Sequence, residues 1–333
     1  MSEPLLRLDS VGVDLPHEGA LEPIIHEVSL ALDRREVVGL VGESGSGKSM
    51  TARAILRLLP PGARTRGDVL LDGDEMPTEG SALSEVRAHR IAMIFQDPRA
   101  SIDPLYTNED HITEGLRVHE GMSREAARAR ALELLGSVGI TDGERVLDSH
   151  PGELSGGMLQ RIMIAGALAG DPDLLIADEP TTALDVTIQS EILAIFERLR
   201  KERGLAILFI THDLEVASAV CDRVLVMYAG RIMEEQQTRE LFRAPRHPYS
   251  AALLAARPHL GVRAEQLATI PGRPPSAFEA IAGCAFHPRC AFSEDRCTTE
   301  VPPLKAVEGG ASSACCRIAE IGSELTSGVE AGA

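Results

Sequence analysis

A glycine-rich stretch between an apolar run and a helical run constrains the fold of this chain more than any other feature. Val37–Val41 is apolar and β-branched, and it leads directly into GESGSGKS at residues 42–49, which is followed by TARAILRLL. A buried strand, a glycine loop ending in Lys-Ser and then a helix form the phosphate-binding loop pattern. A glycine-rich turn with an unrelated lysine is the alternative, and it does not account for the flanking strand and helix.

The loop residues predict specific contacts to a triphosphate and its Mg²⁺. Glycines let the loop come close enough for backbone N–H groups to meet phosphate oxygens, and the following helix adds the positive end of its dipole. Lys48 is expected to neutralise the β- and γ-phosphates, and Ser49 to hold Mg²⁺. The expected loop contacts to the nucleotide are Gly42, Ser44, Gly45, Gly47, Lys48 and Ser49.

A second acidic element is needed to hold the metal, and one apolar strand ends in two carboxylates. Leu174–Ala177 runs into Asp178 and Glu179. Asp178 is placed to bind Mg²⁺ through water, as the corresponding aspartate does in phosphate-loop enzymes. Glu179 is then free to act as the general base on the attacking water. Without other evidence, an Asp-Glu pair after a strand is often only the start of a solvent-exposed loop. The phosphate loop in the same chain favours the catalytic interpretation instead.

The rest of the first part of the chain predicts an α/β domain. From Leu5 to about Thr238, short β-branched runs alternate with longer helical stretches, which is typical of a largely parallel sheet. Residues 109–146 break the alternation with mainly helical sequence and predict an inserted helical subdomain. The candidate core strands are Val37–Val41, Ile91–Phe95, Leu174–Ala177, Ala206–Thr211 and Val224–Met227.

Length and charge exclude several classes of protein. At 333 residues the chain is long enough for one domain and an appendage. The sequence contains no uninterrupted apolar run of the length that crossing a bilayer needs, and its polar start lacks the layout of a signal peptide, so we expect a protein of the cytosol. A net charge of −17 opposes attraction to phosphate backbones and argues against a nucleic-acid partner.

Three further segments identify the kind of phosphate-loop protein. Leu154-Ser155-Gly156-Gly157-Met158 opens a helical run shortly before the Asp-Glu pair, so its amides lie at a helix N-terminus suited to phosphate. It resembles the signature motif of ABC ATPases, with Met158 in place of the usual glutamine. Gln96 resembles the family's Q-loop residue, His212 its switch histidine and Asp185 its D-loop residue.

The resemblance covers Leu5 to about Glu235 and implies a fold, an activity and site roles. The implied fold is α/β, with a RecA-like core, an antiparallel β subdomain and a helical subdomain. ATP is the implied nucleotide, with Glu179, His212 and Gln96 catalytic and with Gln96 also near Mg²⁺. Ser155, Gly156, Gly157 and Asp185 are expected to meet the ATP held by an opposite subunit when two such domains close over two nucleotides.

One position departs from the family pattern. ABC ATPases usually place an aromatic residue on an early strand to stack on adenine, and the aligned position here holds Leu15. The sequence has no Phe, Tyr or Trp in its first forty residues. We hypothesise that adenine is held by aliphatic contacts or from elsewhere and that discrimination between ATP and GTP is weak.

After residue 238 the sequence becomes rich in proline and cysteine. We expect residues 1–238 to form the nucleotide-binding domain, with the helical subdomain at about 97–165, residues 239–320 a small accessory domain and residues 321–333 a loose tail. His247-Pro248-Tyr249 resembles the segment that opens the C-terminal region of ATPases in the oligopeptide, dipeptide and nickel importer group. Cys221 lies at a helix-to-strand junction and is expected to be a small buried apolar residue.

Clustered cysteines in the accessory region predict a metal site of open identity. Their spacing fits neither a simple zinc knuckle nor the ferredoxin run. A small accessory domain buries little apolar surface, so a bound metal is favoured as an additional source of stability. In the resembled group a similar tail is associated with a [4Fe–4S] cluster; zinc and unliganded thiols remain alternatives. The carried-over ligands are Cys284, Cys290, Cys297 and Cys315, with Cys316 as a substitute for the last.

The resemblance also implies partners. They are a second ABC ATPase, two transmembrane permease subunits and an extracytoplasmic solute-binding protein, which place the chain on the cytoplasmic face of the membrane. Ser46 and Met158 resemble the D-type subunit, so pairing with a nonidentical ATPase is expected. The solutes left open are dipeptides, longer peptides, nickel chelates and glutathione-like compounds.

Three other functions are disfavoured by the sequence. A soluble ABC ATPase acting on nucleic acid or ribosomes is disfavoured by the acidic charge and the compact helical insertion. A regulatory subunit that does not hydrolyse ATP is disfavoured by the presence of Lys48, Asp178, Glu179 and His212. A GTPase is disfavoured because no NKxD motif appears.

Overall fold

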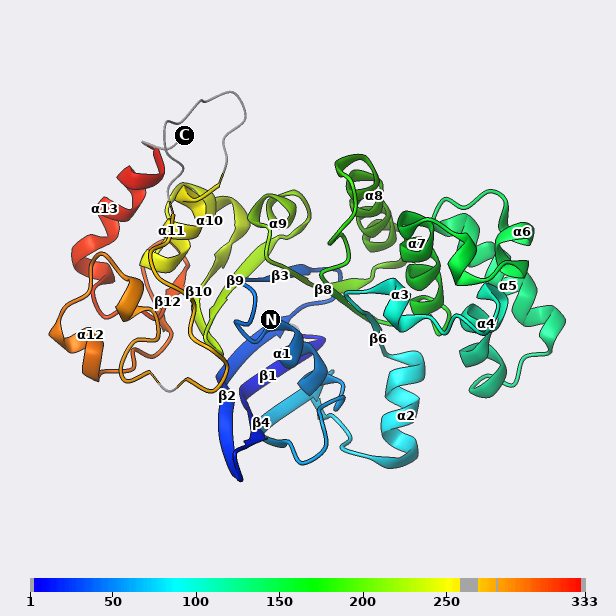
Figure 1. The fold of residues 1–333 in the computed structure, drawn as a ribbon, viewed down its shortest axis with the longest axis horizontal. Helices are drawn as coiled ribbons and strands as arrows, with labels where there is room; N and C mark the ends of the chain where they lie inside the picture. Colours follow the sequence, from blue (N-terminus) through cyan, green and yellow to red (C-terminus); the bar gives the residue numbers. More distant parts are fainter. Residues whose placement is uncertain (1–2, 258–268, 280, 331–333) are drawn as a thin grey trace. The chain divides into compact units, whose positions relative to one another are not determined.

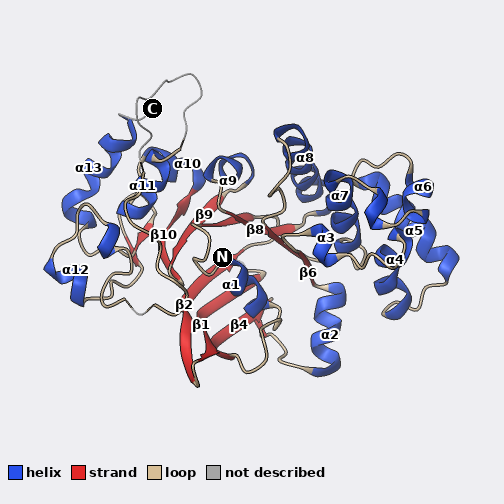
Figure 2. Cartoon of the chain, in the orientation of Figure 1, coloured by secondary structure: helices blue, strands red, loops and turns tan. Residues whose placement is uncertain are grey.

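The computed structural model describes residues 3–257, 269–279 and 281–330. They form two compact units, each assembled from several stretches of the chain (Figure 1). The first unit comprises the residues up to Leu6, Leu32–Val37 and Leu70–Ile210. The second comprises Arg7–Ala31, Val38–Val69 and the residues from Thr211 onward. Both units combine strands with helices (Figure 2), so the predicted α/β class is confirmed.

Parallel strands form the core of the first unit. β7 (Leu174–Asp178) pairs in parallel with β6 (Ile91–Ile94) on one side and with β8 (Ala206–Thr211) on the other. Every residue of β7 is buried, which explains its continuous apolar sequence. α2 (Gly80–His89) precedes β6, and α8 (Val186–Arg203) links β7 to β8.

A cluster of helices occupies the inserted stretch of the first unit. The helices between residues 108 and 167 form this cluster (Figure 1). Side-chain oxygens cap several helix starts: Thr107 accepts from Asp110 N–H and Ser123 from Ala126 N–H. The bounds are α3 (Pro98–Ser101), α4 (Asn108–Val118), α5 (Arg124–Ser137), α6 (Gly143–Asp148) and α7 (Gly156–Ala167).

The second unit places the phosphate loop between a strand and a helix. β3 (Val37–Val41) pairs in parallel with β9 (Arg223–Tyr228), which pairs antiparallel with β10 (Arg231–Gln237). α1 (Lys48–Ile55) follows the loop. The other strands of this part are β1 (Leu6–His17), β2 (Ala20–Leu32) and most of β4 (Arg64–Leu71). Leu70 and Leu71 of β4 belong to the first unit, where they pair antiparallel with β5 (Asp74–Glu75).

The strands predicted from the sequence are confirmed. β3 and β8 have the predicted bounds, β6 ends at Ile94, and β7 and β9 extend to Asp178 and Tyr228. The strands are short and almost wholly apolar, and such runs are too short to be buried helices.

The C-terminal segment is built onto the sheet of the second unit. β12 (Ser312–Ser313) pairs antiparallel with β10, and β11 (Lys305–Ala306) pairs with β12. α9 (Leu214–Val220) precedes β9, and the helices α10 (Thr238–Arg243), α11 (Pro248–Ala255) and α12 (Asp295–Thr299) follow β10.

The segment expected to be a loose tail contains a helix. α13 (Ile318–Glu330) packs against α11, and its Ile321 and Leu325 are each 2% exposed. The expectation of a loose tail from residue 321 is therefore wrong as far as residue 330, and residues 331–333 lie outside the described residues. The physical reason is the amphipathic spacing of these two apolar side chains, one helical turn apart.

Across the described ranges, no helix has both the length and the apolar character needed to span a bilayer.

Candidate functional site

The phosphate loop of the second unit has the backbone shape that its glycines predict. Gly42, Gly45 and Gly47 have φ of 156°, 79° and 107°. A Cβ on Gly42 would lie 2.1 Å from the carbonyl oxygen of Met227, so no larger residue fits there without backbone movement. Lys48 begins α1 and donates from Nζ to the carbonyl oxygens of Gly42 (2.8 Å) and Glu43 (3.0 Å). The lysine ammonium is therefore already folded back over the loop.

The Ser46 hydroxyl in this loop has no hydrogen-bond partner among the described residues. This missing partner supports a phosphate ligand. Ser46 is 4% exposed, and its Oγ has no hydrogen-bond partner in the part of the chain that the structure describes. The Ser46 carbonyl oxygen accepts from Gly230 N–H at 2.8 Å. A buried hydroxyl without a partner costs free energy unless a ligand satisfies it. The loop therefore fits a polyphosphate.

The two carboxylates at the end of β7 differ in environment. Asp178 is the last residue of the strand and is 3% exposed. Glu179 lies just beyond the strand in the left-handed region, with φ of 48°, and its N–H donates to Ile210 O at 2.9 Å. A glutamate in this region is uncommon and costs roughly 1–2 kcal/mol, which the turn must offset.

The Glu179 carboxylate meets two donors. Gln96 Nε2 and Thr182 Oγ1 each donate to Glu179 Oε2 at 2.9 Å. Gln96 follows β6, which neighbours β7 in the sheet, so the strand order explains how residues far apart in sequence meet. The sequence predicted Gln96 as a site residue but did not predict Thr182. The one indication of Thr182 in the sequence was its position three residues after Glu179.

Residues of the signature and D-loop segments lie together in the first unit. Ser155 caps α7, and Asp185 caps α8 by accepting from Ile188 N–H at 3.0 Å. A Cβ built on Gly157 would lie 2.7 Å from Ile188 Cγ2, so the starts of the two helices approach closely. Amides at a helix start favour an anion, so the role of the start of α7 in binding nucleotide stays a prediction.

His212 belongs to the second unit and follows β8. Its neighbour Asp213 caps α9, accepting from the N–H groups of Glu215 and Val216, and Asp213 N–H donates to Thr211 Oγ1 at 3.0 Å. These bonds fix the turn that carries the histidine.

The region around Leu15 contains an aromatic contact that the sequence did not predict. His17, on the same strand β1, stacks on Phe278 with ring centroids 4.0 Å apart and an interplanar angle of 8°. Phe278 comes from the C-terminal segment, so pattern matching along the first strand could not find it.

Five thiols surround one small cavity of the second unit. Among its lining residues are Cys284, Cys290, Cys297, Cys315 and Cys316, together with Phe286 and Arg317. Cys297 Sγ and Cys316 Sγ lie 3.6 Å apart. None of the six cysteines forms a disulfide, and Cys221 is 7% exposed, as predicted.

The thiols are not arranged as metal ligands in this structure. Within residues 3–257, 269–279 and 281–330, no three His, Cys, Asp or Glu side chains meet in a way that could hold a metal ion. Burial raises the pKa of Cys284, Cys315 and Cys316 to about 11 each, which favours the neutral thiol. The thiols gather, but a metal would require them to turn toward a common centre and to lose protons.

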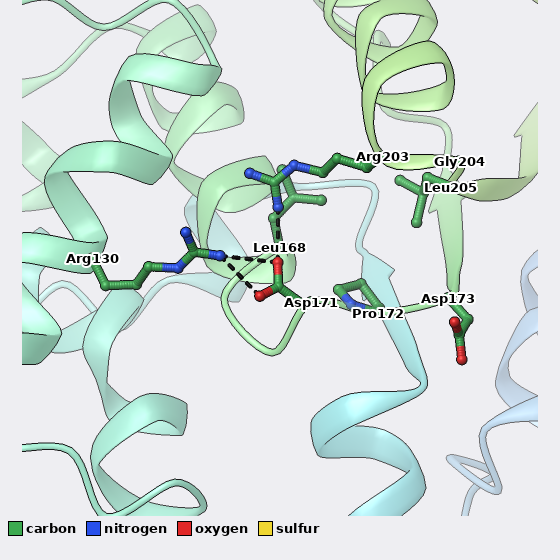
Figure 3. A pocket seen from close by; sticks show the side chains of 8 residues that line it. All are labelled: Arg130, Leu168, Asp171, Pro172, Asp173, Arg203, Gly204 and Leu205. Carbon is green, nitrogen blue, oxygen red and sulfur yellow. Dashed lines mark hydrogen bonds and ion pairs between the residues drawn. The ribbon is translucent and has the colours of Figure 1, made fainter.

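A pocket elsewhere in the first unit contains none of the predicted site residues. Asp171 lies between two arginines (Figure 3): Arg130 Nη2 is 2.9 Å from both of its carboxylate oxygens, and Arg203 Nη1 is 3.0 Å from Oδ1. Because the guanidinium groups already pair with a carboxylate, the pocket offers little to an anionic ligand.

Comparison with known families gives two matches, to separate parts of the chain. The ABC transporter family model matches residues 25–182. The model of the oligopeptide/dipeptide transporter C-terminal region matches residues 233–297.

Curated relatives match nearly the whole chain. A Brucella melitensis protein named as a peptide import ATP-binding protein is 47% identical over 311 residues, which cover 89% of this chain and 92% of the relative. A Brucella abortus protein with the same kind of name is 44% identical over 314 residues, covering 94% of each chain.

Solved structures share the fold. The dimeric ATP-binding cassette MJ0796, in a post-hydrolysis state bound to ADP and Pi, has a TM-score of 0.63 and 30% identity and covers 70% of this chain and 99% of its own. CbiO1 from Clostridium perfringens, part of the ABC transporter complex CbiONQ, has a TM-score of 0.62 and 27% identity, with coverage of 72% and 91%.

Proposed function

The chain belongs to the ABC transporter family of ATP-binding proteins, and we propose that it is the ATPase that energises import of peptides through a membrane complex. The phosphate loop, with Lys48 folded over it and the unpartnered Ser46 hydroxyl inside it, carries the ATP-binding part of this proposal. The match of residues 233–297 to the oligopeptide/dipeptide transporter C-terminal region supports the solute class.

The residue roles that we propose follow the chemistry of each site. Amides of the loop and Lys48 bind the β- and γ-phosphates, and Ser49 with Asp178 hold Mg²⁺, which supplies charge neutralisation when bound. Glu179 accepts a proton from the attacking water, while its bond with Gln96 positions the carboxylate. His212 contacts the γ-phosphate, and the amides of Ser155, Gly156 and Gly157 together with Asp185 complete the site of a partner ATPase.

We propose the assembly that this chemistry requires. The chain pairs with a second, nonidentical ATPase, and closure of the pair over two ATP molecules drives two permease subunits supplied by an extracytoplasmic solute-binding protein. This assembly places the chain on the cytoplasmic face of the membrane.

Uptake by reconstituted vesicles tests the function. The complete complex is placed in liposomes with ATP on the side that carries the ATPases, and uptake of labelled dipeptides, longer peptides, nickel chelates and glutathione is measured. Peptide uptake that requires ATP and is lost in Lys48→Ala supports the proposal. Lys201→Ala, at a side chain 71% exposed on α8, is the matched control and should transport normally.

Two outcomes would count against this function. Unchanged transport by Lys48→Ala would show that ATP binding at this loop is not needed for transport. ATP-dependent uptake of nickel chelates or glutathione without any peptide uptake would refute the peptide class while keeping the importer.

We propose further that the thiol cavity binds a [4Fe–4S] cluster, with zinc as the alternative metal. The support is the convergence of Cys284, Cys290, Cys297 and Cys315 on one cavity, with Cys316 beside Cys297 as a fifth candidate. Iron, sulfide and zinc are measured on anaerobically purified protein, with Cys284→Ser and Cys221→Ser compared. About four irons and four sulfides per chain, lost only in Cys284→Ser, support the cluster; protein without iron or zinc would refute a metal site.

A further inference from the structure

A bidentate ion pair joins the phosphate loop to the C-terminal segment within the second unit. Arg289 Nη1 lies 2.6 Å from Glu43 Oε2, and Nη2 lies 3.1 Å from Glu43 Oε1. The Arg289 side chain is 5% exposed and that of Glu43 is 23% exposed. Two parallel charge-assisted bonds fix direction as well as distance. The Glu43 carboxylate is therefore held in one position.

The backbone of the same residue is held as well. Glu43 N–H donates to the hydroxyl of Tyr249 at 2.9 Å. Tyr249 is fully buried and packs against Tyr228 and Phe286, with ring centroids 4.6 and 5.2 Å away. This tyrosine is the last residue of the His-Pro-Tyr segment, which resembled an importer group in the sequence but had no assigned contact.

Arg289 is itself held by further contacts in the second unit. It ends the short 3-10 helix His287–Arg289, between Cys284 and Cys290 of the thiol cavity. Its Nε donates to Pro271 O at 2.9 Å, and its Nη1 lies 3.3 Å from the Tyr228 hydroxyl. The guanidinium therefore has little freedom to leave Glu43.

Electrostatics explains why a loop that binds phosphate needs this contact. Glu43 lies between Gly42 and Ser44, in the loop proposed to take a triphosphate. An uncompensated carboxylate there would repel the nucleotide, and the repulsion is weakly screened in a sheltered site. Arg289 cancels that charge. Holding the loop in advance also lowers the entropy lost when the nucleotide binds.

We propose that Arg289 and Tyr249 are positioning residues for nucleotide binding: Arg289 neutralises Glu43, and both residues hold the start of the phosphate loop in its binding shape. The inference rests on the proposed role of this loop as the ATP site. It gives the C-terminal segment a direct effect on nucleotide affinity, which adds to its proposed metal site.

Affinity measurements on the assembled complex test the proposal. A fluorescent ATP analogue is titrated, and the KM and kcat of ATP hydrolysis are measured in parallel. Arg289→Gln should raise Kd and KM about tenfold, the loss of about 1.4 kcal/mol, with kcat nearly unchanged. Tyr249→Phe keeps the ring packing but removes the acceptor of Glu43 N–H, and it should raise Kd about threefold.

A double variant separates this role from a structural one. If Arg289 acts by neutralising Glu43, then Glu43→Gln combined with Arg289→Gln should bind nucleotide more tightly than Arg289→Gln alone. General damage to the fold would not be repaired by a second substitution. Arg273→Gln removes an exposed ion pair with Glu279 in the same segment and should leave Kd unchanged.

The outcomes distinguish this inference from the proposed function. Wild-type affinity in Arg289→Gln, or a double variant no better than Arg289→Gln, would overturn the charge role. If Arg289→Gln does not fold, Tyr249→Phe decides: weaker binding supports the positioning, and wild-type affinity overturns it. Wild-type complex that binds no nucleotide would instead overturn the proposed function itself.

Discussion

At the scale of single residues, the phosphate loop is shaped by its own glycines and held by Arg289 of the C-terminal segment. The loop's glycines and Lys48 were predicted from their spacing, because a lysine and N–H groups in this order serve one chemistry. Arg289 was not predicted, because its only signal was an arginine between two cysteines and its partner lies far away in sequence. Contacts made by folding distant segments together leave no local pattern.

Two glycines of the loop provide a matched test at this scale. Gly42→Ala would place a Cβ 2.1 Å from the Met227 carbonyl oxygen, whereas Gly45→Ala meets nothing within 4 Å. Both have positive φ, so each loses roughly 1–2 kcal/mol from backbone strain, and only Gly42→Ala adds a clash with main chain. We expect chemical denaturation to show a clearly larger loss of unfolding free energy for Gly42→Ala. Equal losses would contradict the loop geometry.

At the scale of elements, strands were predictable and the C-terminal additions were not. The apolar runs that became β7 and β8 follow from burial on both faces. β11 and β12 are two residues each, too short for any periodicity. α13 did carry a signal in the spacing of Ile321 and Leu325, but the polar and small residues around them favoured a tail.

Strand β10 carries a buried acid that makes stability depend on pH. Glu234 is fully buried; its Oε1 accepts from Gln236 Nε2 and Arg246 N–H, and burial raises its pKa to about 7 from 4.5. The folded state therefore keeps a proton that the unfolded chain releases above its lower pKa, so this contribution to stability is lost as pH rises from about 4.5 through about 7.

Glu234→Gln should remove that dependence. Between about pH 5 and about pH 8, the unfolding free energy of the wild type should fall relative to the variant by roughly 3 kcal/mol at most. Glu240→Gln, on the partly exposed face of α10, is the control and should follow the wild type. Parallel pH profiles for wild type and Glu234→Gln would show that Glu234 is ionised in the folded protein.

At the scale of the whole molecule, the sequence predicts a linear division of the chain, whereas each compact unit is assembled from several stretches. The phosphate loop and His212 belong to the second unit, whereas Gln96, Asp178 and Glu179 belong to the first. The linear division at residue 238 also did not anticipate that β12 pairs with β10. Chain order does not reveal such interleaving, because strand pairing is set by tertiary packing.

The central claim is that this chain binds ATP and that Glu179, just beyond β7, is the base that activates the attacking water. The nucleotide retained by the assembled complex tests this claim most directly. The complex is incubated with labelled ATP, separated rapidly from free nucleotide, and its bound nucleotide is identified. The wild type should yield ADP, and Glu179→Gln should retain ATP with turnover reduced at least about a hundredfold. Turnover by Glu179→Gln at the wild-type rate would contradict the account.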